Sequence, residues 1–252
     1  MLMFGWRDLT PSEFSLFEDM RMSEDNNKKV RLYVFVGAYG SGKSEVSVHF
    51  AHMLKQQDPS AKVMLADLDI VNPYYRSADA KDALEAEGIH VIVPEYANTN
   101  VDVPALSGEV YSAFDMPDTV AVFDIGGEDL GARVLGAMLS RFQKIEYRVF
   151  MVVNAFRPFT SDPEGIRQMC AELSEAARLP ISGFINNSNL LEDTTEEELI
   201  EGEQVVLEAS KLTGIPLVYQ TGLDNVLPES WSERTPAGIP VLRMDRKVLY
   251  TY

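Results

Sequence analysis

A glycine-rich turn in the first fifth of the chain constrains the fold more than any other feature. The turn has the sequence Gly37-Ala38-Tyr39-Gly40-Ser41-Gly42-Lys43-Ser44 and follows an apolar run that ends at Val36. It fits the pattern G-x-x-x-x-G-K-[ST], in which backbone N–H groups and a helix N-terminus surround a phosphate. The pattern arises by chance in about one chain in a hundred of this length. Because a strand pattern precedes it and a helical pattern follows, we expect a phosphate-binding P-loop.

Each position of this turn has an expected role. Lys43 is predicted to reach the β- and γ-phosphates and to act in catalysis, and the Ser44 hydroxyl is predicted to ligate Mg²⁺. The other residues predicted to contact the nucleotide here are Gly37, Tyr39, Gly40, Ser41, Gly42 and Glu45. The turn therefore predicts a nucleotide-phosphate site.

Length, charge and cysteine content exclude several other classes of protein. A chain of 252 residues with 46% apolar residues fits one large α/β domain. A formal charge of −17 argues against nucleic acid or an anionic membrane as the main partner. Cys170 is the only cysteine, so an intrachain disulfide and a C-x-x-C motif are excluded, and its helical pattern predicts a core residue.

The hydropathy of the sequence and its N-terminus predict a cytoplasmic protein that does not insert into a membrane. No apolar run approaches the roughly 18 residues of a membrane-spanning helix. The N-terminus lacks the basic region of a signal peptide. The three histidines, His49, His52 and His90, do not form a metal-ligand cluster.

From residue 30 onward, strand-like and helix-like segments alternate. This alternation predicts a three-layer, doubly wound and mostly parallel α/β sheet of the P-loop NTPase type. We expect strands at 31–36, 62–67, 90–93, 119–124, 147–153, 181–186, 216–220 and 239–243, with the last at the sheet edge. Helices are expected at 43–56, 78–87, 104–114, 130–142, from 163 onward and at 195–212. Thr195 and Glu198 form the capping box that begins the last of these helices.

Residues 1–29 differ in pattern from the rest of the chain. Thr10-Pro11-Ser12-Glu13 has the pattern of a helix start, and residues 23–29 are polar and linker-like. We therefore expect an N-terminal extension with a candidate helix at 1–29 and a nucleotide-binding domain at 30–252. Whether the extension docks on a partner or is dispensable stays open.

Acidic residues follow two of the predicted strands. Asp124 closes an apolar strand as a Walker B carboxylate does, and Gly127 is expected to bring a backbone N–H close to the γ-phosphate. Asp67 and Asp69 close the second strand, and alternation directs both to the same side. Because the carboxyl ends of parallel strands meet at one sheet edge, these carboxylates are expected near the phosphates. There, one carboxylate can support Mg²⁺ while another orients water.

Together, the P-loop, the D-x-D after the second strand and the D-x-G-G after the fourth resemble the MinD/ParA-type ATPases. These proteins belong to the SIMIBI class of P-loop NTPases, and the similarity extends to the CobQ/CobB family. The resemblance spans about residues 30–243 and implies ATP and Mg²⁺ as cofactors. It implies that Asp67 and Asp124 serve the metal and that Asp69 positions the hydrolytic water. It also implies that Asn187, with Asn186 as the alternate, hydrogen-bonds adenine, and that the loop from Leu223 to Pro228 lines the base.

The chain departs from that family at one position. Ala38 stands where MinD and ParA proteins carry a second, signature lysine that acts across a dimer interface. The resemblance therefore does not imply their nucleotide-sandwich dimer, and a homodimer stays open. No N-K-x-D sequence is present, so ATP is favoured over GTP.

These motifs lead to one leading function and two alternatives. The leading hypothesis is an Mg²⁺-dependent ATPase whose switch loops couple hydrolysis to a conformational change or a protein partner. The first alternative is a small-molecule kinase or ATP-dependent ligase that uses residues 94–118 as a substrate pocket. The second is a regulator or scaffold that binds nucleotide without hydrolysing it.

Two arginines, Arg76 and Arg157, follow strands at the same sheet edge. Each could contact a phosphate or a partner, or form a surface ion pair, and the choice stays open.

Overall fold

All strands of the described chain belong to one sheet. The computed structural model describes residues 29–69, 77–93, 108–126 and 129–245. Within these ranges the strands are β1 (Leu32–Val36), β2 (Lys62–Asp67), β3 (Ile89–Ile92), β4 (Thr119–Asp124), β5 (Tyr147–Val153), β6 (Gly183–Asn186), β7 (Leu217–Leu223) and β8 (Val241–Met244). Their order is β3-β2-β4-β1-β5-β6-β7-β8, and every pairing between neighbours is parallel. This confirms the doubly wound α/β fold, with a sheet that is parallel throughout.

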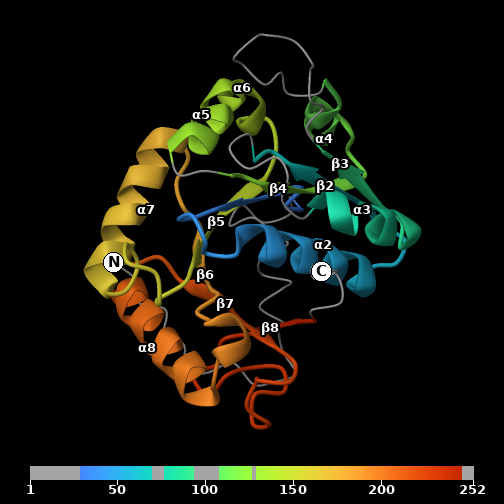
Figure 1. The fold of residues 1–252 in the computed structure, drawn as a ribbon. Coiled ribbons are helices and arrows are strands. Elements are labelled where there is room, and N and C mark those ends of the chain that lie inside the picture. Colours follow the sequence, from blue (N-terminus) through green and yellow to red (C-terminus); the bar gives the residue numbers. More distant parts are fainter. Residues whose placement is uncertain (1–28, 70–76, 94–107, 127–128, 246–252) are drawn as a thin grey trace.

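Helices cover both faces of this sheet (Figure 1). One face carries α2 (Lys43–Gln57) and α3 (Ser77–Ala86). The other face carries the 3₁₀ turn η1 (Gly108–Tyr111) and the helices α4 (Ser112–Asp115), α5 (Asp129–Ala137), α6 (Leu139–Phe142), α7 (Pro163–Ala177) and α8 (Glu196–Thr213). A second 3₁₀ turn, η2 (Leu191–Asp193), precedes α8. The expected three layers, helix, sheet and helix, are confirmed.

Strand β1 shows why the strands are apolar without alternation. Leu32, Val34 and Val36 belong to the core under α5, α7 and α8. Tyr33 and Phe35 belong to the core under α2. A parallel sheet is buried on both faces, so both sets of side chains must be apolar. The apolar run before the P-loop therefore reflects the central position of β1, between β4 and β5.

Local sequence signals fix the starts of two helices. Asp162 caps α7, where its side chain accepts a hydrogen bond from Gly165 N at 2.9 Å and Pro163 begins the helix. Thr195 and Glu198 form the predicted capping box of α8, with Thr195 N donating to Glu198 Oε2 at 2.7 Å. Such caps satisfy N–H groups that have no partner inside the helix.

Several predicted elements differ from the observed ones. Most shifts are of one or two residues: β6 begins at Gly183 instead of 181, and β8 spans Val241–Met244 instead of 239–243. The helix expected at 130–142 is broken into α5 and α6, because Met138 leaves helical geometry while its side chain is buried in the core. Strand β7 continues past Gln220 to Leu223, because Leu223 pairs with Met244 of β8. In the described part of the helix expected at 104–114, η1 precedes the short α4.

Other expectations concern single residues or the chain as a whole. Cys170 is buried in the core under α7, as predicted, and burial raises the pKa of its thiol. Strand β8 lies at the sheet edge, as predicted. The extension expected at 1–29 lies outside the described residues except for Lys29, so that domain boundary stays a prediction. None of the described helices has the length and apolar character needed to cross a bilayer.

Candidate nucleotide-binding site

The glycine-rich turn lies at the carboxyl edge of the sheet, between β1 and α2. Strand β1 has β4 on one side and β5 on the other. The chain builds the sheet outward in one direction through β2 and β3, and in the other through β5 to β8. Ligands of open α/β sheets bind in the crevice at such a switch point. The turn therefore lies at the place where this fold favours a ligand.

Two glycines of the turn are required by close packing as well as by backbone conformation. Gly37 has φ 152°, and a Cβ at this position would lie 2.4 Å from Val152 O. Gly42 has φ 84°, and a Cβ there would lie 2.2 Å from Asn187 Nδ2. Helix α2 begins at the next residue, Lys43, so the N–H groups of its first turn are directed at the loop. This is the backbone geometry of an anion site.

Two side chains of the loop are buried with polar atoms inside it. Lys43 is buried, and its Nζ donates to Ala38 O at 3.0 Å, so the ammonium group lies across the loop. Ser41 is 1% exposed, and its Oγ has no hydrogen-bond partner among the described residues. A buried hydroxyl without a partner is costly. A phosphate oxygen would satisfy it, so the loop fits a phosphate group.

The carboxylates predicted from the sequence lie beside this loop. Asp67 and Asp124 are paired in register at the ends of β2 and β4. Asp69 N donates to Asp67 Oδ1 at 2.9 Å, which folds the D-x-D segment back on itself. Ser44 of the P-loop hydrogen-bonds the Asp124 side chain. The structure thus brings Ser44, Asp67, Asp69 and Asp124 together.

Asp124 carries the strongest electrostatic signal of the site. Burial raises the pKa of its carboxyl from 3.8 to about 7, and the Asp67 charge adds to the rise. The Ser44 hydrogen bond and the Lys43 charge oppose this shift, and Asp69 adds to it. Asp124 Oδ1 is buried and has no hydrogen-bond partner among the described residues. A divalent cation would satisfy this oxygen and neutralise the clustered charge, so the oxygen donors present fit Mg²⁺.

These carboxylates do not form a complete metal cage. Within the described ranges, no group of three His, Cys, Asp or Glu side chains has the geometry to hold a metal ion by itself. Mg²⁺ is usually bound through one or two carboxylates together with waters and substrate phosphates. Ser44 and Asp124 are therefore the residues that would hold the ion beside a nucleotide, and Asp67 lies next to Asp124 on the neighbouring strand.

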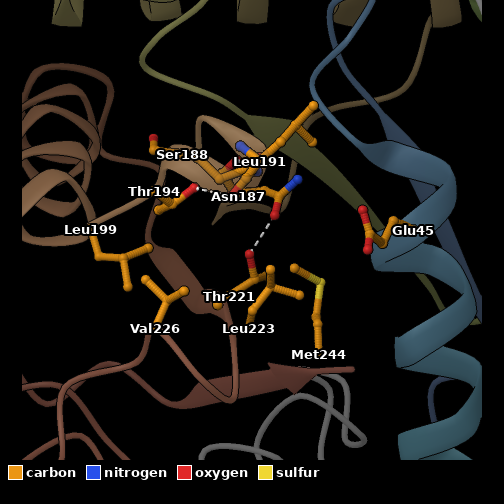
Figure 2. Close-up of a pocket in the computed structure, with 12 residues that line it drawn as sticks. Glu45, Asn187, Ser188, Leu191, Thr194, Leu199, Thr221, Leu223, Val226 and Met244 are labelled. Carbon is orange, nitrogen blue, oxygen red and sulfur yellow. Dashed lines mark hydrogen bonds between the residues drawn. The ribbon is translucent and has the colours of Figure 1, made fainter. Parts of the chain in front are cut away.

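A pocket continues from the P-loop toward β7 and β8 (Figure 2). Asn187 lies at its centre, 2% exposed, where its Nδ2 donates to Ser41 O at 2.8 Å. Its Oδ1 accepts a hydrogen bond from Thr221 Oγ1 at 2.6 Å. One amide N–H and one lone pair of Asn187 remain for a base. Asn187 thus joins the P-loop, β6 and β7, and its contact with adenine stays a prediction.

The alternate residue, Asn186, points elsewhere. Its Nδ2 donates to Gln220 Oε1 at 2.6 Å, and its Oδ1 accepts from Ser188 N and Ser188 Oγ. Asn186 is completely buried and does not line the pocket. Of the two asparagines, Asn187 is therefore the one in position to meet a base.

The pocket lining mixes apolar and polar side chains. It consists of Glu45, Asn187, Ser188, Asn189, Leu191, Thr194, Leu199, Thr221, Gly222, Leu223, Val226 and Met244. Glu45 extends toward it from the first turn of α2 (Figure 2). Of the predicted loop from Leu223 to Pro228, Leu223 and Val226 line the pocket, whereas Pro228 is buried and does not line it. Sequence reasoning missed Thr221, for which the only signal was its place directly after the predicted end of a strand.

The other residues that the sequence suggested for the site differ in exposure and in their contacts. Tyr39 is 74% exposed, although it belongs to the P-loop. Arg157, in the loop after β5, donates from its Nε to Gly40 O at 3.1 Å. Gly127 and Arg76 lie outside the described residues, so their roles stay predictions. Within the described chain, the site therefore gains Arg157 as a neighbour of the phosphate loop.

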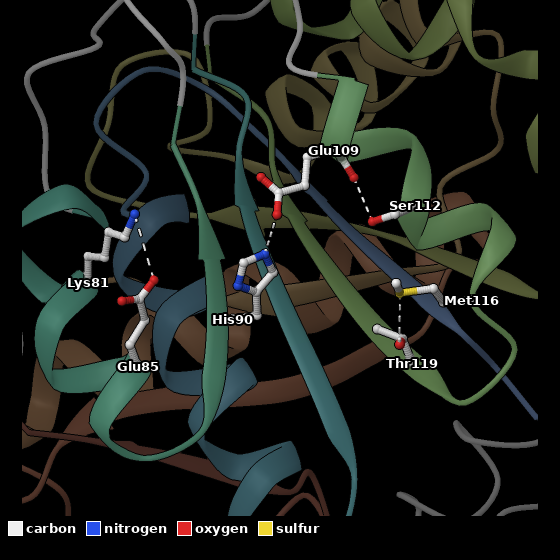
Figure 3. A network of polar contacts seen from close by, with 7 residues as sticks. All are labelled: Lys81, Glu85, His90, Glu109, Ser112, Met116 and Thr119. Carbon is white, nitrogen blue, oxygen red and sulfur yellow. Dashed lines mark hydrogen bonds and ion pairs between the residues drawn. The ribbon is translucent and has the colours of Figure 1, made fainter.

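His49 and His90, which the sequence predicted to form no ligand cluster, make structural contacts. His90 Nε2 lies 2.7 Å from Glu109 Oε1, which joins β3 to η1 at the surface (Figure 3). His49 is buried on α2, and its Nε2 lies 3.1 Å from the backbone of Asp245, just after β8. Neither histidine contacts the carboxylate cluster, and His49 instead connects α2 to the end of the sheet.

Comparison with known proteins supports the fold. No family model matches the chain, and no curated protein matches it by sequence. Among solved structures, chloroplast FtsY from Physcomitrella patens matches with TM-score 0.54 and 16% identity, over 78% of this chain and 60% of that one. The cell division protein FtsY from Thermotoga maritima matches with TM-score 0.50 and 18% identity, over 76% and 61%. The chain thus spans about three-fifths of the length of these structures.

At such low identity the likeness shows the fold alone. It confirms the P-loop NTPase architecture, and the SIMIBI class stays an expectation from the motifs. It gives no support to the narrower resemblance to MinD/ParA or CobQ/CobB proteins.

Proposed function

We propose that the protein is an Mg²⁺-dependent nucleoside triphosphatase that prefers ATP. The observation that supports this most is the buried Asp124 carboxyl at the end of β4. Ser44 of the P-loop hydrogen-bonds it, and its Oδ1 has no partner among the described residues. A binding protein that does not hydrolyse nucleotide needs only the phosphate loop. The added carboxylates, Asp67 and Asp69, favour hydrolysis.

In this proposal each residue has a distinct task. The P-loop N–H groups and Lys43 bind the β- and γ-phosphates and offset the charge that develops on them. Ser44 and Asp124 would hold Mg²⁺, which would supply positive charge to offset the negative charge of the phosphates. Asp69 orients the attacking water and accepts its proton. Hydrolysis then changes the contacts of the segments after β2 and β4, which would signal to a protein partner.

The preference for ATP rests on the sequence after β6, not on the pocket lining. No N-K-x-D sequence follows β6, where a guanine-binding carboxylate would be expected. GTP is the competing nucleotide, because the comparisons leave the base open. Glu45 is the acidic residue that lines the pocket, and a carboxylate there accepts hydrogen bonds only. It would meet the exocyclic amine of adenine, or the N1–H and N2 amine of guanine.

Phosphate release from ATP and from GTP tests the proposal. We expect slow release with Mg²⁺, none with EDTA, and loss of activity in Lys43→Ala and Asp69→Ala. Lys211→Ala, an exposed change on α8, is the matched control and should behave as wild type. Binding of a non-hydrolysable ATP analogue should survive in Asp69→Ala but fail in Lys43→Ala. Full activity in both site variants would overturn the proposal.

A further inference from the structure

The Asp69 side chain fills the space that any side chain at position 126 would need. A Cβ built on Gly126 would lie 1.7 Å from Asp69 Cγ and 2.2 Å from Asp69 Cβ. Non-bonded carbon atoms pack at about 3.5–4.0 Å, so alanine at position 126 would force Asp69 to move. Gly126 does not have a left-handed backbone, so space and not conformation excludes a larger residue here.

The backbone around Asp69 has little freedom to withdraw. Leu68 N donates to Asp124 O at 2.8 Å, which ties the segment after β2 to the end of β4. Asp69 N is held by Asp67 Oδ1 at 2.9 Å. Moving the backbone of Asp69 would break these hydrogen bonds. A methyl group on residue 126 would therefore displace the Asp69 carboxyl group first.

A second glycine lies on the other side of Gly126. A Cβ built on Gly131, in the first turn of α5, would lie 1.6 Å from Gly126 O and 2.9 Å from Ile125 Cγ2. Helix α5 therefore approaches the Gly126 carbonyl as closely as a backbone can. The resulting order of contacts is α5, Gly131, Gly126 and Asp69.

We propose that Gly126 and Gly131 are positioning residues for Asp69, and that their contact makes the water-orienting carboxylate depend on the position of α5. This inference deepens the proposed function and rests on it. Gly131 lets α5 lie against the loop after β4, and Gly126 leaves the space in which Asp69 lies. A shift of α5 toward this loop would push Gly126 into Asp69 and slow hydrolysis without changing the P-loop.

Three glycine-to-alanine variants test the inference. Gly126→Ala and Gly131→Ala add a methyl group at the two close contacts. Gly136→Ala is the matched control, because it adds the same group to α5 where the nearest atom is Ala176 O at 4.0 Å. We expect kcat to fall by about 100-fold in Gly126→Ala, because the water-orienting group is misplaced. Gly131→Ala should fall in the same direction, and Gly136→Ala should match wild type.

The affinity for nucleotide separates positioning from general damage. The Kd of a fluorescent, non-hydrolysable ATP analogue should stay within about twofold of wild type in all three variants. A loss of affinity that parallels the loss of kcat would mean that the P-loop is disturbed, and would overturn the inference. Unchanged kcat in both Gly126→Ala and Gly131→Ala would also overturn it.

A double-mutant cycle with Asp69→Gly tests the contact itself, even where hydrolysis is abolished. Asp69→Gly removes the side chain that the new methyl group would meet. Gly126→Ala should therefore lower the Tm in the wild-type background but change it little in the Asp69→Gly background. Equal losses of Tm in both backgrounds would show that Gly126 does not act through Asp69.

The two proposals can fail separately. Wild-type protein that neither binds nor hydrolyses nucleotide would refute the proposed function, and with it the role assigned here. Wild-type hydrolysis together with additive losses in the cycle would refute the positioning role alone.

Discussion

Arg157 Nε donates a hydrogen bond to the carbonyl oxygen of Gly40, 3.1 Å away and 117 residues earlier in the chain. The loop that carries Arg157 is held by Asn154, whose Oδ1 accepts from Phe156 N and whose Nδ2 donates to Asn189 O. The terminal amino groups of Arg157 make no hydrogen bond or ion pair within the described residues. A fixed cation thus lies beside the phosphate loop of a strongly acidic protein.

We predict that Arg157→Ala weakens the binding of ATP by about tenfold, which corresponds to one hydrogen bond to a charged group. The reason is the loss of both the contact to Gly40 and a positive charge next to the phosphates. Arg157→Lys keeps the charge but not the planar fork, so it should recover part of the affinity. Titration with a fluorescent analogue at low and high salt measures both effects. Equal affinity of wild type and Arg157→Ala would contradict the prediction.

The raised pKa of Asp124 predicts how stability depends on pH. The folded protein holds this proton more tightly than the unfolded chain, because the pKa rises from 3.8 to about 7. The contribution of Asp124 is therefore favourable below about pH 4, and it is lost as pH rises toward about pH 7. Thermal unfolding in EDTA should show this loss, and Asp124→Asn should remove it. The exposed change Asp118→Asn is the control and should keep the wild-type profile.

The same pKa predicts proton release on binding the metal. Mg²⁺ requires the ionised Asp124 carboxylate, so binding of Mg²⁺ with nucleotide near pH 6 should expel a proton. Calorimetry in two buffers with different ionisation enthalpies would measure it, because the apparent enthalpy then differs between the buffers. Identical apparent enthalpies at pH 6 would mean that Asp124 is already ionised.

The hydrogen bonds of Asn187 to the P-loop and to Thr221 predict that substitutions here change both the folding free energy and the binding of nucleotide. Asn187→Ala leaves Ser41 O and Thr221 Oγ1 without their partner, which should cost about 2 kcal/mol of folding free energy. Thr221→Val should cost about 1 kcal/mol, and Thr221→Ser should restore the loss. Denaturant unfolding with and without ATP would measure these values. Thr213→Val is the control, because it also removes a hydroxyl but lies at the end of α8, away from the pocket. The stabilisation of this variant by ATP should equal that of wild type.

Glu45 predicts the choice of base. Glu45→Gln converts an acceptor-only group into one that also donates. The amide could accept from the exocyclic amine of adenine and donate to its N1, but it would lose one of the two acceptors offered to guanine N1–H and N2, so the ratio of ATP to GTP affinity should rise. The expected change is about tenfold, which is typical for one hydrogen bond in a binding pocket. Competition of both nucleotides against one fluorescent analogue measures the ratio. An unchanged ratio would assign base selection to Asn187 and its neighbours instead.

Much of the fold follows from local patterns in the sequence. Strands β2, β4 and β5 have the predicted bounds, because apolar runs in a parallel sheet end where polar turn residues begin. The capping box of Thr195 and Glu198 was predicted from two residues alone. The break at Met138 was not predicted, because the apolar helical pattern continues through this buried residue.

The part of the site that surrounds the phosphates was also predictable from local patterns. The part that would surround the base was less predictable. Lys43, Ser44 and Asp124 belong to short motifs whose spacing fixes their geometry. Thr221 and Met244 line the pocket only because β7 and β8 pair as they do, which no local pattern encodes. The close packing of Asp69 on Gly126 is likewise a contact between distant loops. Sequence reasoning chose the neighbouring Gly127 as functional and gave Gly126 no role.

The last strand in the sheet order, β8, completes the pocket beside the phosphate loop. Met244 of β8 lines the pocket. His49 of α2 lies within hydrogen-bond distance of the backbone of Asp245, the residue after β8. On the ribosome, the phosphate loop emerges early, whereas these closing residues emerge long after it. A nascent chain that stops before β8 would carry the whole phosphate motif and still lack a finished base pocket. If the proposed function holds, nucleotide would therefore stabilise this fold fully only after β8 has been synthesised.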